Sequence, residues 1–246
     1  MGFGIEAQAY ARGRPDYPGE LLSWLRGNLE LAPGRTAVDL GAGTGKFTKL
    51  LAQTGAEIIA VEPVDAMRAQ LSASVQGVRA ISGTAEAMGF EDGSVDAVVC
   101  AQAFHWFANE RALTEIHRVL RPGGKLGLVW NVRDKSLDWV AAITDIITPY
   151  EGDAPRYYTG DWRQPIEGGP FSRLEETCFE YQHVGSPQHV IVDRFLSVSF
   201  IAALPEEEKT KVRQKLCDLI EHHPKLKGCE SIAIPYRTHA YYCARG

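Results

Sequence analysis

The chain has 246 residues, of which 45% are hydrophobic, and its 26 basic and 31 acidic side chains give a formal net charge of −5. This length and hydrophobic content fit one α/β domain with an elaboration better than two independent domains. The charge balance lacks the cationic excess typical of phosphate-backbone binding, so we expect no nucleic-acid partner. No stretch approaches the roughly 18 apolar residues that a membrane span needs, and the first residues do not read as a signal peptide, so we expect a cytoplasmic protein without a membrane partner.

The first half of the chain alternates strand-like with helix-like stretches. Short apolar runs predict strands at 36–40, 57–62, 78–81, 95–101 and 125–131. Helical spacing of apolar residues predicts helices at 46–54, 64–73 and 108–120 between them. Strands that alternate with helices indicate a parallel, doubly wound sheet.

The second half changes character after residue 132. Helices are expected at 139–147, 190–203 and 206–222, strands at 177–184 and 231–243, and 150–170 is rich in glycine, proline and aromatic residues. We expect a mostly parallel, seven-stranded Rossmann-like sheet whose last two strands lie at one edge, with a helical cap. The predicted organisation is one domain over 1–246, with an N-terminal lid segment at 1–33, a cofactor-binding core at 34–132, and the cap helices and last strands at 133–246.

A glycine-rich loop follows the first predicted strand. Gly41, Gly43 and Gly45 allow the backbone to approach a ligand, and the next helix offers free N–H groups at its N-terminus. In open α/β sheets, ligands bind beside this loop. Glu62 closes the second strand 21 residues after Gly41, where its carboxylate can accept hydrogen bonds from ribose hydroxyls. An amino acid joined to a nucleoside would suit such a site.

Other nucleotide families use similar loops, but their spacing differs. The dinucleotide fingerprint would need a third glycine where Lys46 stands, which disfavours NAD without excluding it. The phosphate-binding P-loop would need glycine at Leu40 and a hydroxyl residue at Phe47, so nucleoside triphosphates are excluded.

Four segments resemble the class I S-adenosylmethionine-dependent methyltransferases. Val-Asp-Leu-Gly-Ala-Gly-Thr-Gly at 38–45 resembles their first motif, and Val-Glu-Pro at 61–63 resembles their acidic second motif. The segment 83–90 with Ser-Val-Asp at 94–96 is similar to their adenine-binding segment and fourth strand, and 120–124 to the turn before the fifth. The resemblance covers roughly residues 34 to 131 in order and register.

The resemblance implies S-adenosylmethionine as the cofactor, S-adenosylhomocysteine as the product, and a role for each matching residue. Asp39 would orient the loop and approach the methionine amino group, Glu62 would bind the ribose, and Pro63 and Met67 would wall the adenine. The cofactor site implied in this way comprises Asp39, Gly41, Ala42, Gly43, Thr44, Glu62, Pro63, Met67, Thr84, Ala85, Glu86, Ala101 and Gln102, joined by Tyr10, Arg14 and His105.

The N-terminal pattern Y-x-x-x-R-P-x-Y-P at 10–18 is similar to the small-molecule subgroup that includes trans-aconitate methyltransferase. In that subgroup the segment folds over the cofactor, which would bring Tyr10 near the sulfonium and let Arg14 bind a carboxylate. The alternative is a surface arm with a proline turn.

Aromatic residues surround His105 directly after the fourth strand. His105 is either a general base that deprotonates the acceptor or a hydrogen-bonded wall of the pocket, and we favour the wall. Aromatic and basic residues further along could line an acceptor pocket, although most are expected in the core or at the rim: Trp130, Arg133, Tyr157, Tyr158, Trp162, Tyr236 and Arg237.

We therefore expect an enzyme that transfers a methyl group to a small molecule, with His105, Tyr10 and Arg14 as catalytic candidates and no metal. A carboxylate acceptor would need only a cation such as Arg14 or Arg133, whereas a hydroxyl or amine would make His105 a more credible base. The Asn/Asp-Pro-Pro-aromatic tetrapeptide of DNA-adenine and glutamine-amide methyltransferases is absent after the fourth strand. The alternative function is a protein that binds S-adenosylmethionine without catalysis.

Overall fold

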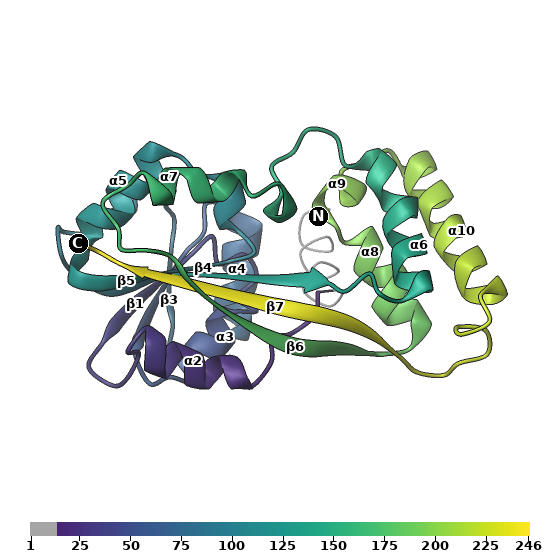
Figure 1. The fold of residues 1–246 in the computed structure, drawn as a ribbon, viewed down its shortest axis with the longest axis horizontal. Coiled ribbons are helices and arrows are strands. Elements are labelled where there is room, and N and C mark those ends of the chain that lie inside the picture. Colours follow the sequence, from purple (N-terminus) through teal and green to yellow (C-terminus); the bar gives the residue numbers. More distant parts are fainter. Residues whose placement is uncertain (1–13) are drawn as a thin grey trace. The chain divides into compact units, whose positions relative to one another are not determined.

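A seven-stranded sheet is the framework of the computed structural model, which describes residues 14–246 (Figure 1). Its strands are β1 (Thr36–Leu40), β2 (Glu57–Val61), β3 (Arg79–Ile81), β4 (Val95–Ala101), β5 (Leu120–Arg133), β6 (Glu175–Gly185) and β7 (Ile232–Ala244). They lie in the order β3-β2-β1-β4-β5-β7-β6, parallel from β3 to β5, with β7 antiparallel. The predicted fold class is confirmed.

The chain forms two compact units. The first, here called the sheet unit, comprises Tyr17–Asn131, Pro155–Phe179 and Thr238–Gly246. The second, the helical unit, comprises Val132–Ala154 and Glu180–Arg237 with the described residues 14–16. Residues 155–179 and 238–246, which belong to the range that the sequence assigned to the cap helices and last strands, thus group with the cofactor-binding core. The single-domain organisation itself stays a prediction.

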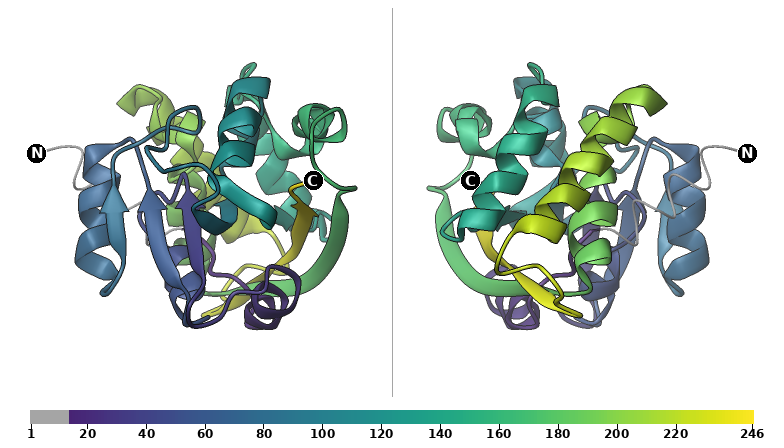
Figure 2. Two further views of the ribbon diagram at one scale, coloured as in Figure 1. Left: turned by 90° about the vertical axis from the view of Figure 1, so that its left-hand side faces the viewer. Right: turned by 90° about the vertical axis from the view of Figure 1, so that its right-hand side faces the viewer.

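Helices cover both faces of the sheet unit. One face carries Ala37, Ile58 and Val99, and these pack in one cluster with buried residues of α2 (Glu20–Asn28) and α3 (Thr48–Ala52). Side chains alternate along a strand, so the residues between them serve the opposite face. Figures 1 and 2 show α2 (purple) and α5 (Glu110–Val119, teal) on opposite sides of these strands. The helix α4 (Asp65–Ser74) and the short α7 (Gln164–Glu167) complete the unit.

The helix α2 was not predicted. Leu21, Trp24 and Leu25 are spaced for one helix face and are buried in the core of the sheet unit. The lid proposed for 1–33 therefore concerns only the residues before α2, and Tyr10 lies outside the described residues.

The predicted stop between α5 and the fifth strand takes the form of a bulge. Val95 pairs with Leu120 and Ala97 with Lys125, so residues 121–124 have no counterparts on β4. Asn109 begins α5 by accepting a hydrogen bond from the Ala112 N–H at 3.0 Å. The strand β5 therefore begins earlier than the predicted residue 125.

The helical unit has its own apolar core. It contains α6 (Asp138–Ile147), α10 (Glu206–His222), the π-helical segment η5 (Gln188–Asp193), α8 (Arg194–Leu196) and α9 (Ser199–Ala202). The helices predicted to fill 190–203 are present as three short segments: η5 contains the β-branched residues Val190, Ile191 and Val192, and the Ser197 hydroxyl donates to the Arg194 carbonyl at 2.7 Å where α8 ends. The segment 148–163 forms three 3₁₀ turns, η2 (Thr148–Tyr150), η3 (Tyr157–Thr159) and η4 (Asp161–Arg163).

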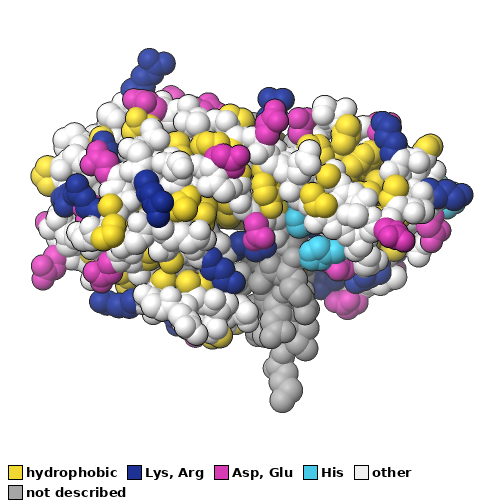
Figure 3. Space-filling model, turned by 90° about the horizontal axis from the view of Figure 1, so that it is seen from below, with side chains coloured by type: hydrophobic (Ala, Val, Ile, Leu, Met, Phe, Trp, Pro, Cys, Tyr) yellow, Lys and Arg dark blue, Asp and Glu magenta, His cyan; other side chains and the backbone are white. Residues whose placement is uncertain are grey.

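Surface charge is mixed. On the face drawn in Figure 3, lysine and arginine side chains are interspersed with aspartate and glutamate over the described residues. In that part of the chain no helix combines the length and apolar character needed to cross a membrane. The expected absence of a nucleic-acid partner and the expected cytoplasmic location stay predictions.

Candidate cofactor site and its aromatic rim

The glycine loop after β1 curls over the end of β2. The N–H groups of Gly41 and Ala42 both donate to the Val61 carbonyl, at 2.9 and 3.2 Å. Gly41 has φ +72°, and a Cβ there would lie 2.8 Å from the Cβ of Ala103. Only glycine allows this conformation so close to the segment after β4. The fold thus brings the predicted loop against the predicted aromatic rim.

Glu62 fastens this loop from the end of β2. Its side chain is buried, with 5% of the residue exposed. One carboxylate oxygen, Oε2, accepts the Gly43 N–H at 2.8 Å, and the other, Oε1, accepts the Val64 N–H at 2.9 Å. Each oxygen has a second lone pair, so the carboxylate can still accept two hydroxyl groups while it holds the loop.

Asp39 lies beneath the loop, near the end of β1, and is 1% exposed. Its Oδ2 accepts the Thr48 hydroxyl at 2.6 Å, but its buried Oδ1 has no hydrogen-bond partner among the described residues. Burial raises the pKa of Asp39 to about 7; the Thr48 hydroxyl opposes this shift and the charge of Glu62 adds to it. A cationic group bound here would stabilise the ionised carboxylate.

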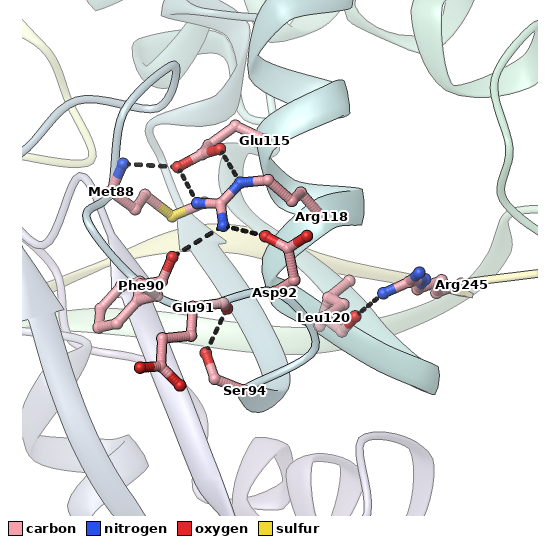
Figure 4. A network of polar contacts seen from close by, with 9 residues as sticks. All are labelled: Met88, Phe90, Glu91, Asp92, Ser94, Glu115, Arg118, Leu120 and Arg245. Carbon is pink, nitrogen blue, oxygen red and sulfur yellow. Dashed lines mark hydrogen bonds and ion pairs between the residues drawn. The ribbon is translucent and has the colours of Figure 1, made fainter.

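The predicted adenine segment is tied to α5 by a charged network (Figure 4). The Met88 N–H donates to Glu115 at 2.9 Å, and Arg118 donates to both oxygens of Glu115, to the Phe90 carbonyl and to Asp92. The hydrogen bond from Arg118 is the largest cause that lowers the pKa of Glu115. The network fixes the end of the segment independently of any ligand.

The other predicted cofactor residues follow the ends of the strands. Thr44, Ala42 and Ala85 are buried, Pro63, Thr84 and Glu86 are exposed, and Met67 and Ala101 are half-buried. Gln102, directly after β4, has φ +58°, which is costly for a residue with a side chain. Such strain is concentrated at functional sites.

A hydrogen bond joins His105 to the aromatic rim. His105 lies in the 3₁₀ turn η1 (Phe104–Trp106), and its Nδ1 accepts the indole N–H of Trp130 at 3.1 Å. Trp130 is 1% exposed, and its ring lies 4.4 Å from that of Trp162 and 5.0 Å from that of Tyr157. Trp130, Tyr157 and Trp162, three of the predicted pocket aromatics, thus pack together. The packing positions the indole of Trp130, which in turn orients His105.

The sequence did not identify Tyr241 of β7 as part of this cluster. Its hydroxyl contacts the Tyr157 hydroxyl at 2.6 Å, Glu176 at 2.7 Å and Arg163 at 3.0 Å. The alternation of buried residues along β7 was the available signal, but it does not reveal which strand lies alongside.

The other predicted residues are not among the residues described so far. Arg14, Arg133 and Tyr236 belong to the helical unit, Tyr158 is 70% exposed, and Arg237 pairs with Asp134. For Tyr158 and Arg237 an exposed position agrees with the expectation that most of these residues are core or rim.

The family whose model matches residues 38–128 is described as a methyltransferase domain. A methyltransferase-like protein of Schizosaccharomyces pombe is 38% identical over 242 residues, which is 97% of this chain and 93% of that protein. A Mycobacterium bovis protein described as a methyltransferase is 39% identical over 238 residues, with the same shares of both chains. The chain belongs to the class I S-adenosylmethionine-dependent methyltransferase family.

The fold of this methyltransferase is also found in solved structures. A protein of Anaeromyxobacter dehalogenans described as a type II methyltransferase superposes with a TM-score of 0.72 at 24% identity, covering 94% of this chain and 97% of the other. Membership of the family makes this chain an enzyme that uses S-adenosylmethionine, as the sequence predicted.

The methyltransferase has features that fit this cofactor. The orphaned Oδ1 of Asp39 suits an ammonium group, the remaining lone pairs of Glu62 suit two ribose hydroxyls, and the glycine loop gives close backbone access. No group of three or more His, Cys, Asp or Glu residues in 14–246 could hold a metal ion.

Proposed function

We propose that the enzyme transfers the methyl group to a carboxylate oxygen of a small molecule. The observation that carries this proposal is the hydrogen bond from Trp130 to Nδ1 of His105, at 3.1 Å. A neutral imidazole that accepts at Nδ1 has its proton on Nε2. A second proton on Nδ1 would face the indole proton, so the contact favours this neutral form. His105 therefore has a donor, and not a base, at Nε2.

This tautomer supports one of the two roles that the sequence left open for His105. A hydroxyl or amine acceptor must lose a proton, and a general base is the usual way to remove it. A carboxylate is already anionic at neutral pH and needs no base. We therefore assign His105 to the wall of the site, where its Nε2–H can hydrogen-bond an oxygen of the acceptor or cofactor.

S-adenosylmethionine, when bound, supplies an activated sulfonium methyl group. The chain then has to position the two reactants and exclude water, and alignment alone can lower a barrier by about 7–11 kcal/mol. We propose that Asp39 binds the amino group and Glu62 the ribose, while 84–86 border the adenine. The loop residues 41–44, Pro63, Met67, Ala101 and Gln102 would enclose the cofactor, and Tyr10 and Arg14 would contribute from the N-terminal segment.

Two likenesses support a carboxylate acceptor. The malonyl-[acyl-carrier protein] O-methyltransferase of Methylococcus capsulatus is 40% identical over 100 residues, although these are only 38% of this chain and 36% of that enzyme. The N-terminal pattern at 10–18 is similar to the subgroup that includes trans-aconitate methyltransferase. In both cases the named compound carries a carboxylate.

Substitution of His105 tests the proposal. Glutamine can accept the Trp130 N–H through its oxygen and present an N–H in place of Nε2, so it imitates the neutral tautomer without being a base. We expect His105→Gln to methylate small di- and tricarboxylic acids at a rate within about tenfold of the wild type, with no loss of rate as histidine titrates. General-base catalysis contributes roughly 10²–10⁴-fold, so a loss of that size in His105→Gln would contradict the proposal. His105→Phe is the matched control that removes the donor.

A further inference from the structure

Tyr157 and Tyr241 join two distant parts of the sheet unit through their hydroxyl groups. Tyr157 lies in the 3₁₀ turn η3, whereas Tyr241 lies on β7 and is 1% exposed. Their hydroxyl oxygens are 2.6 Å apart. Both tyrosines belong to the sheet unit, and so do Trp130 and His105. The contact therefore ties η3 to a residue that lies 84 positions further along the chain.

The hydroxyl of Tyr241 uses its full hydrogen-bonding capacity. It contacts Glu176 at 2.7 Å and Arg163 at 3.0 Å as well as Tyr157. Burial opposes the ionisation of Glu176, but hydrogen bonds from His239 and Tyr241 lower the pKa of this carboxyl overall, so it is ionised at neutral pH. A carboxylate can only accept and a guanidinium can only donate, so the Tyr241 proton goes to Glu176. The two lone pairs of the hydroxyl then accept from Arg163 and Tyr157. Tyr157 is therefore a donor, and a directional bond holds its ring in addition to packing.

The ring of Tyr157 lies against the indole of Trp130, with 5.0 Å between the ring centres. The ring of Trp162 lies 4.4 Å from the same indole. Trp162 is fixed to η3, because its own indole N–H donates to the Tyr157 carbonyl at 3.0 Å. Trp130 in turn donates to Nδ1 of His105 at 3.1 Å. A continuous series of contacts thus connects the hydroxyl of Tyr241 with the imidazole of His105.

The next residue on β7, Tyr242, offers a comparison of the same chemistry. Its hydroxyl donates to Glu175 at 2.8 Å. Successive residues of a strand point to opposite faces of the sheet, and Tyr242 packs against the cluster that contains α2, with its ring 6.2 Å from that of Trp24. The two tyrosines thus make similar bonds on opposite faces, and of the two it is Tyr241 that is connected to His105.

We propose that Tyr157 and Tyr241 are positioning residues for the methyl transfer, because they hold the Trp130 indole in the orientation that donates to Nδ1 of His105. The proposal rests on the function proposed above, since it takes His105 as a hydrogen-bond donor in the wall of the site. The two tyrosines act through His105 and need no contact with the cofactor or the acceptor. A displacement of about 1 Å in the positioning of reacting groups can lower a rate by up to about a hundredfold, so a small shift of the indole is measurable.

A double-mutant cycle distinguishes positioning from a general effect on stability. Tyr241→Phe removes the hydroxyl and keeps the ring, and Tyr242→Phe is the matched control. We expect Tyr241→Phe to lower kcat for a carboxylic acid by roughly three- to tenfold, and by no more than His105→Phe lowers it. In the His105→Phe background, Tyr241→Phe should change kcat by less than about twofold, because residues that act through one another are not additive. Tyr242→Phe should leave kcat unchanged in both backgrounds.

The indole N–H of Trp130 gives a second readout that needs no acceptor. Its signal in a nitrogen–proton correlation spectrum is assigned from its absence in Trp130→Phe, and His105→Phe shows where it lies once the bond to Nδ1 is lost. In Tyr241→Phe the signal should move from its wild-type position toward that of His105→Phe. Tyr157→Phe removes the same bond from its other end, so it should give the same shift and serves as the test if Tyr241→Phe does not fold.

Three results would overturn the assignment. The first is an equal loss of kcat from Tyr241→Phe in the wild-type and His105→Phe backgrounds. The second is a Trp130 signal that stays in place when either hydroxyl is removed. The third is a loss of kcat in Tyr242→Phe as large as that in Tyr241→Phe, because destabilisation would then explain both. Failure of the proposed function looks different: if no carboxylic acid is methylated but the indole signal moves as expected, the positioning stands and the acceptor assignment fails.

Discussion

The sheet unit and the helical unit each contain a charged side chain that is almost fully buried and has at least one polar atom without a hydrogen-bond partner among the described residues, and these two side chains have opposite signs. In the sheet unit the atom is Oδ1 of Asp39, and in the helical unit the atoms are Nε and Nη1 of Arg194. Other charged groups near the predicted site are satisfied within the chain: Glu62 accepts two backbone N–H groups, and Arg118 pairs with Glu115 and Asp92. In the sheet unit, the unpartnered oxygen of Asp39 is the atom to which the proposed ammonium group of the cofactor would bind.

The largest expected effect concerns Glu62, a buried carboxylate whose oxygens both have hydrogen-bond partners within the chain. Glu62→Ala removes the proposed ribose contact and also leaves the N–H groups of Gly43 and Val64 without their acceptor. We expect the affinity for S-adenosylhomocysteine to fall by roughly a hundredfold in calorimetry, since charge-assisted hydrogen bonds contribute about 1.5–3 kcal/mol each. The melting temperature should fall as well.

Glu57→Ala is the matched control, because Glu57 lies exposed at the other end of the same strand. It should leave both quantities unchanged. Unaltered affinity in Glu62→Ala would remove Glu62 from the site.

Asp39, whose Oδ1 has no partner among the described residues, predicts an effect of intermediate size on cofactor affinity, and this effect depends on pH. With a pKa of about 7, Asp39 is protonated in most molecules at pH 6 and ionised in most at pH 8. An ammonium group requires the ionised form, so S-adenosylhomocysteine should bind about tenfold more weakly at pH 6 than at pH 8 and release a proton on binding near neutral pH. Calorimetry in buffers with different ionisation enthalpies measures that proton.

Asp39→Asn provides the control and a stability test. Its affinity should be low and independent of pH. Because burial raises the pKa of Asp39 above its unfolded value, the wild type loses stability as the pH rises from about 4 to about 7. The melting temperature of Asp39→Asn relative to the wild type should therefore rise over that range, and a constant difference would contradict the orphaned carboxylate.

The smallest expected effect concerns the network that holds the adenine segment. Arg118→Met removes the bonds to Glu115, Asp92 and the Phe90 carbonyl without touching the predicted cofactor contacts. We expect the affinity for S-adenosylhomocysteine to fall by roughly two- to tenfold, which is the effect of about 0.5–1.5 kcal/mol. Arg79→Met, at the exposed start of β3, should have no effect. A loss as large as that of Glu62→Ala would mean that Arg118 itself contacts the cofactor.

The parts of the fold that sequence predicted are those with local signals. The glycine loop, Glu62 and the first four strands follow from short motifs and apolar runs, and their positions in the structure differ from the prediction by one residue at most. The roles of the cofactor residues stay predictions.

The features that the sequence did not predict depend on contacts between segments that are distant along the chain. Tyr241 contacts Tyr157 and Glu176 only because β7 and β6 return to the sheet. Arg14, Arg133 and Arg194 come from three separate parts of the chain, and the charges of Arg14 and Arg133 act on Arg194. A single sequence holds no signal for such contacts, nor for the π-helical conformation at the start of the helical segment predicted at 190–203. The hydrogen bond that fixes the tautomer of His105 is of the same kind, since Trp130 is 25 residues away.

The chemical stability of the transferred methyl group tests the central claim most directly. The wild type would be incubated with S-adenosylmethionine labelled in its methyl group and with small di- and tricarboxylic acids, amines and alcohols in parallel, and each product would then be treated with mild base. A methyl ester releases labelled methanol under these conditions, whereas methylamines and methyl ethers do not. We predict labelled methanol from a carboxylic acid alone. A label that resists base, or that appears only with an amine or alcohol, would contradict the proposed function.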